Sequence, residues 1–295
     1  MTETAGRPLL LAVLGHPVAH SLSPVMHEAA LAAVGWSGRY IACDVAPSDL
    51  EAALRGLRVL GFVGCNVTVP LKEAAARLAT VCSAEAARSG SVNTLALEAD
   101  GVLRADTTDG RGLLAALREE VGFEAAGRRV VVLGAGGAAR GIVGALLAAG
   151  ARNVSVANRT LERARSLAAT FGTRVRPVAL DVEALGPALA SADLLVQATT
   201  VGMGTDGLPI PESALESLPV AAIVCDIVYA PPETALMRLA RRSGHPVVGG
   251  LGMLAWQAAL AWEVWFQRTG PVAVFRQAAG RALAGRAGDV AGGVR

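Results

Sequence analysis

Three short stretches of the chain hold side chains of the kinds that bind polar ligands and move protons. The stretch "GHPVAHSLSP" (15–24) gathers two His, two Ser, two Pro and a Gly directly behind an apolar run. "NVTVPLK" (66–72) places Thr68 and Lys72 at the end of another apolar run, and "TTDG" (107–110) contains Asp109. At the carboxyl end of a strand, where open α/β sheets bind ligands, an ammonium group can stabilise a developing negative charge and supply a proton. The alternatives are a solvated lysine and an ordinary turn carboxylate.

A fourth stretch is typical of nucleotide binding. "VVVLGAGGAAR" sets Gly134, Gly136 and Ala139 in a G-x-G-x-x-A pattern between a β-branched run and an apolar helical segment. Such glycines permit a tight turn and close approach of a pyrophosphate to a helix N-terminus. The alternative is a plain strand-to-helix turn, but the flanking segments favour a dinucleotide site.

The residues at the end of the next strand indicate which dinucleotide is bound. An NAD site usually ends this strand with an acid that binds the ribose 2′-hydroxyl. This one ends in Asn158, Arg159 and Thr160, with Arg163 one helical turn later. Because a guanidinium can hold a 2′-phosphate through two hydrogen bonds, the sequence favours NADP as the cofactor.

Alternating apolar runs and helical patterns must position these residues. In the first part we expect strands at 8–15, 38–45 and 61–69, helices at 23–35 and 48–61 capped by Ser23 and Ser48, and a hairpin over 92–110 that turns at 99–101. A second series of strands begins at 128, 153, 193, 221 and 245, and a Trp-rich helix covers 251–270. This alternation predicts an α/β protein with largely parallel sheets.

The series divides into two expected domains. Residues 1–108 form a substrate-binding, catalytic domain with a mostly parallel sheet, completed by helices within 251–285. Residues 109–250 form a Rossmann-type NADP-binding domain, with a cleft between the two. The small polar tail 286–295 is expected to be disordered.

Composition excludes several classes of protein. The 295 residues are 53% hydrophobic and 18% charged, which is typical of a globular chain. A net charge of +2 without a Lys/Arg run argues against nucleic-acid or membrane partners. The four cysteines lack metal-ligand spacing, and no apolar run approaches a membrane span. We therefore expect a soluble cytoplasmic protein with no metal. We also expect small-molecule ligands and a monomer or homodimer, but composition does not decide either.

Taken together, the motifs resemble the shikimate dehydrogenase family, which also includes quinate dehydrogenases. The shared stretches are, in order, "GHPVAHSLSP", "NVTVPLK", "GSVNT", "TTDG", "GAGGAAR", "NRT", "DIVYAPPET" and "GLGMLAWQAA". They extend from Gly15 to Gln257, and eight motifs in the same order are far more specific than any one of them.

The resemblance implies a reaction and a role for each residue. It implies reversible hydride transfer between NADPH and 3-dehydroshikimate, in the biosynthesis of chorismate and the aromatic amino acids, with Lys72 and Asp109 as the catalytic pair. Ser21 and Ser23 are expected to bind the substrate carboxylate. The expected ring-hydroxyl ligands are Thr68, Asn93, Asp109 and Gln257, beside Lys72, with Tyr229 contacting the substrate from the nucleotide side. The expected cofactor residues are Gly134, Ala135, Gly136, Gly137, Ala138, Asn158, Arg159, Thr160, Arg163, Ile227 and Gly250.

Three positions depart from the family pattern. Thr107 and Gln197 stand where Asn is usual, and Ala230 replaces the usual Asn after Val-Tyr. These departures leave open a quinate, aminoshikimate or aminoquinate dehydrogenase of the same family. A sensor that binds the dinucleotide or metabolite without turnover is an alternative of a different class.

Overall fold

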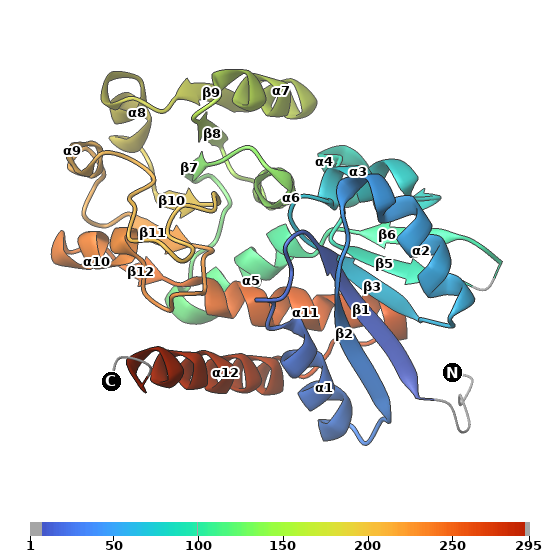
Figure 1. Ribbon diagram of the computed structural model, residues 1–295. Helices are drawn as coiled ribbons and strands as arrows, with labels where there is room; N and C mark the ends of the chain where they lie inside the picture. Colours follow the sequence, from blue (N-terminus) through green and yellow to red (C-terminus); the bar gives the residue numbers. More distant parts are fainter. Residues whose placement is uncertain (1–7, 99, 293–295) are drawn as a thin grey trace. The chain divides into compact units, whose positions relative to one another are not determined.

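The computed structural model describes residues 8–98 and 100–292, which form two compact units. The first unit comprises Met1–Thr108 with Gln257–Arg295, and the second comprises Asp109–Trp256. Each unit contains its own six-stranded sheet. Figure 1 shows the elements of both.

The sheet of the first unit has the order β2-β1-β3-β5-β6-β4. Strands β1, β2 and β3 are parallel, whereas β5 runs antiparallel to both β3 and β6 as the predicted hairpin requires. The strands are β1 (Leu9–Gly15), β2 (Gly38–Asp44), β3 (Gly64–Val67), β4 (Val81–Cys82), β5 (Thr94–Leu97) and β6 (Leu103–Asp106). The helices are α1 (Ser23–Ala33), the 3₁₀ turn η1 (Pro47–Asp49), α2 (Leu50–Val59), α3 (Lys72–Leu78), α4 (Ala84–Ser89) and α12 (Val272–Gly292).

Strand β1 lies between β2 and β3 and is buried on both faces, which explains its unbroken apolar sequence. Ala12 and Leu14 face an aliphatic cluster made with α2 and α3. An aromatic cluster forms elsewhere in the same unit, where His27 stacks on Tyr40 with ring centroids 4.3 Å apart and meets Phe275 edge-on. Helix α1 packs beside α12, which supplies Phe275 (Figure 1).

The sheet of the second unit is fully parallel, in the order β12-β11-β10-β7-β8-β9. Its strand order reverses between β7 and β10, as in a doubly wound dinucleotide-binding fold. The strands are β7 (Arg129–Leu133), β8 (Asn153–Asn158), β9 (Val175–Ala179), β10 (Leu194–Gln197), β11 (Ile223–Asp226) and β12 (Val247–Val248). The helices are α5 (Asp109–Val121), α6 (Gly137–Ala148), α7 (Leu161–Phe171), α8 (Val182–Leu189), α9 (Glu212–Leu215) and α10 (Ala235–Arg242), and α11 (Gly250–Phe266) continues into the first unit.

Two predicted helix caps are wrong. Ser23 is the first residue of α1 and makes no cap bond; instead Ser21 Oγ accepts the N–H of Ser23 at 3.2 Å. Ser48 lies inside the 3₁₀ turn that precedes α2, because Pro47 starts a tighter helical turn before the α-helix. Both serines stand one or two residues from the position that a capping hydroxyl needs.

Other boundaries also differ from the expectation. Helix α12 continues to Gly292, so residues 286–292 are helical where a disordered tail was expected. The many Ala and Gly residues of this segment show no clear helical pattern in the sequence. The short elements β4, α4 and β9 were not predicted, and Ala99 of the hairpin turn lies outside the described residues.

In the part of the chain that the structure describes, no helix combines the length and apolarity of a membrane span. The same residues contain no group of three His, Cys, Asp or Glu side chains suited to a metal ion.

Candidate active site

The first unit gathers polar side chains at one edge of its sheet. Thr68 follows β3, Asn93 precedes the antiparallel β5, and Thr108 follows β6, so all three lie at the same edge. Backbone bonds from Val67 N–H to Asn93 O (2.9 Å) and from Asn93 N–H to Asp106 O (3.1 Å) fix the spacing.

Asn93 is the centre of a buried hydrogen-bond network. Its Oδ1 accepts the backbone N–H of Thr108 (2.8 Å) and the hydroxyl of Thr94 (3.1 Å). Its Nδ2 donates to Thr108 Oγ1 (2.9 Å) and to Gln257 Oε1 (3.3 Å). Thr108 Oγ1 in turn donates to the carbonyl of Gln257 (3.0 Å). The structure therefore brings Asn93 and Gln257 together although 164 residues separate them.

Lys72 is the only lysine in the sequence and the first residue of α3. Its side chain is buried, with 9% exposed, which is rare for lysine in a folded protein. The backbone N–H of Val92 donates to the Lys72 carbonyl (3.1 Å), so the start of α3 is bonded to the residue preceding Asn93. Lys72 thus belongs to the same edge of the sheet as Asn93.

The stretch around Ser21 and Ser23 adjoins this edge through the backbone. His16 N–H donates to the carbonyl of Val69 (3.1 Å), and Thr68 N–H donates to the carbonyl of Leu14 (2.8 Å). Gly15 allows this approach, because a Cβ there would come within 2.5 Å of Thr68 Cγ2.

A second set of buried hydrogen bonds begins at Ser23. Ser23 is hydrogen-bonded to Tyr40, and burial raises the pKa of the Tyr40 phenol well above its usual value. The Tyr40 hydroxyl donates to Asn66 Oδ1 (2.7 Å), and Asn66 Nδ2 donates to both Asn93 O and Thr94 Oγ1 (3.0 Å each). Hydrogen bonds thus connect Ser23 to Asn93 through the protein interior.

Asp109 and Tyr229 belong to the second unit. Asp109 directly follows Thr108 and is the first residue of α5, where it is buried and the helix dipole favours its negative charge. Tyr229 lies three residues beyond the end of β11 and is half-buried.

In the second unit, the Gly-rich stretch occupies the switch point of the sheet. Gly134 has φ +110°, and a Cβ there would lie 2.9 Å from the carbonyl of Ala198, so only glycine fits. Gly136 caps α6, and a Cβ there would meet nothing within 4 Å. Ala135, Gly137 and Ala138 complete this loop and the first turn of α6. The open backbone at a helix N-terminus fits a pyrophosphate.

Two arginines follow β8: Arg159 comes directly after the strand, and Arg163 lies in the first turn of α7. The Nδ2 of Asn158 donates to the Thr160 carbonyl (2.9 Å), which folds the chain between β8 and α7. Arg159 and Arg163 are exposed, and within residues 8–98 and 100–292 neither guanidinium has a hydrogen-bond or ion-pair partner. By contrast, Arg165 of the same helix pairs with Glu162 at 3.4 Å.

The structure brings Ile227 and Gly250 together. A Cβ at Gly250 would overlap the carbonyl groups of Ile227 and Val228. Both residues follow strand ends at the edge of the sheet that carries the Gly-rich loop.

Several residues of this arrangement were missed from the sequence. Thr108 and Asn66 were not selected, although a polar residue inside the apolar run "GCNV" was a visible signal for Asn66. Gln197, noted only as a departure, is fully buried; it donates to Val201 O and accepts the N–H of Thr199 (2.8 Å each), shaping the loop after β10. Among the described residues, the Oγ1 of Thr107 is buried without a hydrogen-bond partner.

A doubly wound sheet with a Gly-rich loop at its switch point and unpaired arginines after the next strand defines a dinucleotide-binding α/β protein. Comparison with known proteins gives the family. Residues 13–95 match "Shikimate dehydrogenase substrate binding domain", 116–203 match "Shikimate / quinate 5-dehydrogenase", and 250–279 match "Shikimate 5'-dehydrogenase C-terminal domain". The chain belongs to the shikimate dehydrogenase family.

Individual relatives are similar over nearly their whole length. A shikimate dehydrogenase (NADP(+)) of Symbiobacterium thermophilum is 46% identical over 290 residues, which cover 97% of this chain and 98% of that protein. The solved structure of Thermus thermophilus shikimate 5-dehydrogenase in complex with NADP(H) and shikimate is 42% identical, with a TM-score of 0.83 over 93% of this chain and 100% of that one. A quinate dehydrogenase of Corynebacterium glutamicum in complex with NAD is 30% identical, with a TM-score of 0.81 over 92% of this chain and 98% of its own.

Proposed function

We propose that this chain catalyses the reversible reduction of 3-dehydroshikimate to shikimate with NADPH, as part of chorismate and aromatic amino-acid biosynthesis. The observation that carries the proposal is the edge of the first sheet, where the only lysine of the chain is buried beside the Asn93–Gln257 network. The similarity to NADP-dependent shikimate dehydrogenases at 41–46% identity supports the same substrate and cofactor.

In this proposal the first unit binds the substrate. Ser21 and Ser23 hold the carboxylate through hydroxyls at the start of α1, whose N-terminus favours an anion. Thr68, Asn93 and Gln257 bind ring hydroxyls, together with Asp109. Short amide and hydroxyl groups fixed by other hydrogen bonds suit this task, because they can reject a ligand whose hydroxyls are misplaced. Tyr229 contacts the substrate from the second unit.

Lys72 and Asp109 are proposed as the catalytic pair. Bound NADPH supplies the hydride. The Lys72 ammonium stabilises the alkoxide that develops on the ring oxygen and gives it a proton. Asp109 keeps the lysine charged and oriented, and it accepts a hydrogen bond from a substrate hydroxyl. In the direction of oxidation, the neutral amine of Lys72 takes up the proton of the shikimate hydroxyl and becomes the ammonium again.

The second unit is proposed to hold NADP. The backbone of Gly134, Ala135, Gly136, Gly137 and Ala138 binds the pyrophosphate, and Ile227 and Gly250 contact the nicotinamide half. Arg159 and Arg163 bind the 2′-phosphate, with Asn158 and Thr160 as further hydrogen-bonding groups. Two exposed arginines without an ion-pair partner among the described residues fit a phosphate better than a neutral ribose hydroxyl.

A related substrate is the second candidate. The buried Oγ1 of Thr107, which has no partner among the described residues, stands where the family usually has Asn, one residue from Thr108. This favours a quinate, aminoshikimate or aminoquinate dehydrogenase as the alternative. We further propose a cytoplasmic enzyme, monomeric or homodimeric, with four reduced cysteines. A sensor without turnover is disfavoured by the presence of both Lys72 and Asp109.

The test is the initial rate of absorbance change at 340 nm with shikimate and NADP⁺, run beside quinate and beside NAD⁺. The proposal expects rapid turnover with shikimate and NADP⁺ and little with the other combinations. Faster turnover with quinate would favour the second candidate. Binding of shikimate and NADP⁺ without any turnover would favour the sensor.

A further inference from the structure

A buried carboxylate outside the proposed catalytic pair lies at the end of β11. Asp226 is only 1% exposed, and its two oxygens accept two donors from the segment that follows. Oδ1 accepts the backbone N–H of Val228 (3.0 Å), and Oδ2 accepts the hydroxyl of Thr234 (2.7 Å). One carboxylate therefore binds both ends of the segment 228–234, which contains Tyr229.

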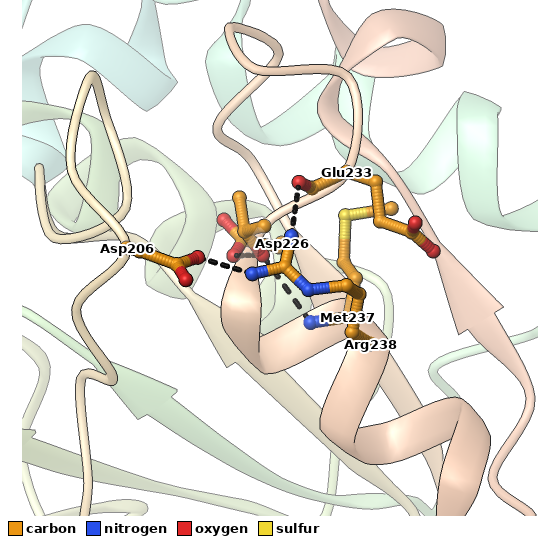
Figure 2. Close-up of polar contacts among 6 residues, drawn as sticks. Asp206, Asp226, Glu233, Met237 and Arg238 are labelled. Atoms are coloured by element: carbon orange, nitrogen blue, oxygen red, sulfur yellow. Dashed lines mark hydrogen bonds and ion pairs between the residues drawn. The ribbon is translucent and has the colours of Figure 1, made fainter.

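The far end of this segment is also the start of a helix. Thr234 Oγ1 accepts the N–H of Met237 (3.2 Å) and so caps α10 while it donates to Asp226. A hydroxyl that donates to one group and accepts from another has a fixed orientation. Asp226, Thr234 and the first turn of α10 thus form one rigid connection (Figure 2).

The loop after β10 is joined to the same helix turn. Arg238 of α10 pairs with Asp206 of that loop and also donates to the carbonyl of Glu233 (3.2 Å), as Figure 2 shows. Gly202, with φ +92°, lets the loop approach Thr234, because a Cβ there would lie 3.3 Å from Thr234 Cγ2. The Arg238–Asp206 pair is largely exposed and therefore contributes little to stability. Asp226 is the stronger of the two connections.

The strand order places these loops on the nicotinamide side. The Gly-rich loop follows β7, and the arginines proposed for the 2′-phosphate follow β8, on one side of β7. A dinucleotide that crosses the switch point must extend its other half over β10 and β11. The two loops that follow those strands are the ones that Asp226, Thr234 and Arg238 hold.

We infer that Asp226 is a positioning residue for the nicotinamide half of the cofactor, acting through the 227–234 segment that carries Ile227 and Tyr229. The inference rests on the proposed function, because it takes NADP as the cofactor. Burial raises the pKa of the Asp226 carboxyl to about 6, so this position holds a charge at a cost in desolvation. An asparagine has the same shape and would cost less free energy to bury, but its single amide oxygen would accept a hydrogen bond from only one of the two donors.

The test compares a whole ligand with half of it. Calorimetric titration measures the Kd of NADP⁺ and of adenosine 2′,5′-bisphosphate, which lacks the nicotinamide half, for wild type and Asp226→Asn. We expect the variant to bind NADP⁺ about fivefold to twentyfold more weakly and the bisphosphate within about twofold of wild type. Hydrogen exchange of the unliganded variant should be faster at residues 228–234.

Asp193→Asn is the matched control. Asp193 also accepts a backbone N–H, that of Arg129 (2.8 Å), but it precedes β10 at the opposite end of the sheet. It should leave both Kd values and the exchange of 228–234 unchanged. Thr234→Val and Thr234→Ser test the same bond from its other end: Val should reproduce the selective loss, and Ser, which keeps the hydroxyl, should restore binding.

Three results would overturn the inference. Equal weakening of both ligands in Asp226→Asn would mean that the variant damages the whole unit, and unchanged binding of both would mean that the carboxylate positions nothing. A Thr234→Ser protein as weak as Thr234→Val would show that the hydroxyl is irrelevant. A wild-type chain that binds adenosine 2′,5′-bisphosphate but fails to turn over shikimate would contradict the proposed function and leave this inference standing.

Discussion

The ligand-binding residues proposed in the two units are held in opposite ways. In the first unit, Asn93, Thr108 and Gln257 hydrogen-bond to one another in the interior. In the second, Arg159 and Arg163 extend into solvent without a partner among the described residues. Neutral hydroxyls of a sugar-like ring are distinguished by geometry, which requires donors and acceptors that are already fixed. A phosphate supplies its own charge, so flexible exposed guanidinium groups suffice.

The largest effect is expected on the catalytic rate, when the proposed proton donor in the first unit is removed. Lys72→Ala should lower kcat about 10²–10⁴-fold and change KM for shikimate little, because the ammonium acts mainly in the transition state. Steady-state kinetics with shikimate and NADP⁺ measure both constants. Arg77→Ala, on the exposed end of the same helix, is the control and should retain wild-type rates. A Lys72→Ala enzyme with an unchanged kcat would exclude lysine as the proton donor.

The stability of the first unit should be more sensitive to acid than that of the second, because the first unit contains the buried His27. This imidazole is fully buried, and burial lowers its pKa to about 3; its Nδ1 accepts the indole N–H of Trp262 (3.1 Å). Between pH 6.5 and 3 the unfolded chain binds a proton that the folded chain does not, so this stability is complete above pH 6.5 and falls on acidification. The loss should approach about 4–5 kcal/mol near pH 3.

Denaturant unfolding from pH 7 to pH 4 measures this dependence. His27→Gln keeps an acceptor for Trp262 but cannot titrate, so its stability should fall less steeply with acid than that of wild type. His20→Gln, at an exposed histidine, should follow the wild-type curve. Parallel curves for wild type and His27→Gln would show that His27 is not the acid-sensitive group.

The sequence predicted the second unit better than the network of the first. The Gly-rich loop and Arg159 follow local rules, since a turn and its flanking strand are contiguous in the chain, and Gly134 has the positive φ that its position requires. Gln257 meets Asn93 only because α11 returns to the first unit, and no local pattern contains that contact. Thr108 was overlooked for the same reason: its partners lie 15 and 149 residues away.

A third prediction measures how far the first unit depends on its network. Asn93→Ala leaves the Thr108 N–H, the Thr94 hydroxyl and the Gln257 side chain without this partner, so the free energy of unfolding should fall by about 2–3 kcal/mol. Urea denaturation provides the value. Asn153→Ala is the control, because within residues 8–98 and 100–292 no hydrogen bond holds that side chain at the start of β8. A loss in Asn93→Ala no larger than in the control would mean that the network contributes nothing to stability.

The exposed arginines should give the smallest and most selective effect. Arg159→Gln removes one or two charged hydrogen bonds to the 2′-phosphate, so kcat/KM for NADP⁺ should fall about tenfold to a hundredfold, while the value for NAD⁺ stays the same. Arg165→Gln, at an arginine already paired with Glu162, should change neither. Because Arg159 has no protein partner among the described residues, its loss should leave the free energy of unfolding unchanged. An equal decline of kcat/KM with NAD⁺ and NADP⁺ would mean that Arg159 supports the fold of the site. The contrast between the fixed network of the first unit and the exposed arginines of the second would then no longer hold.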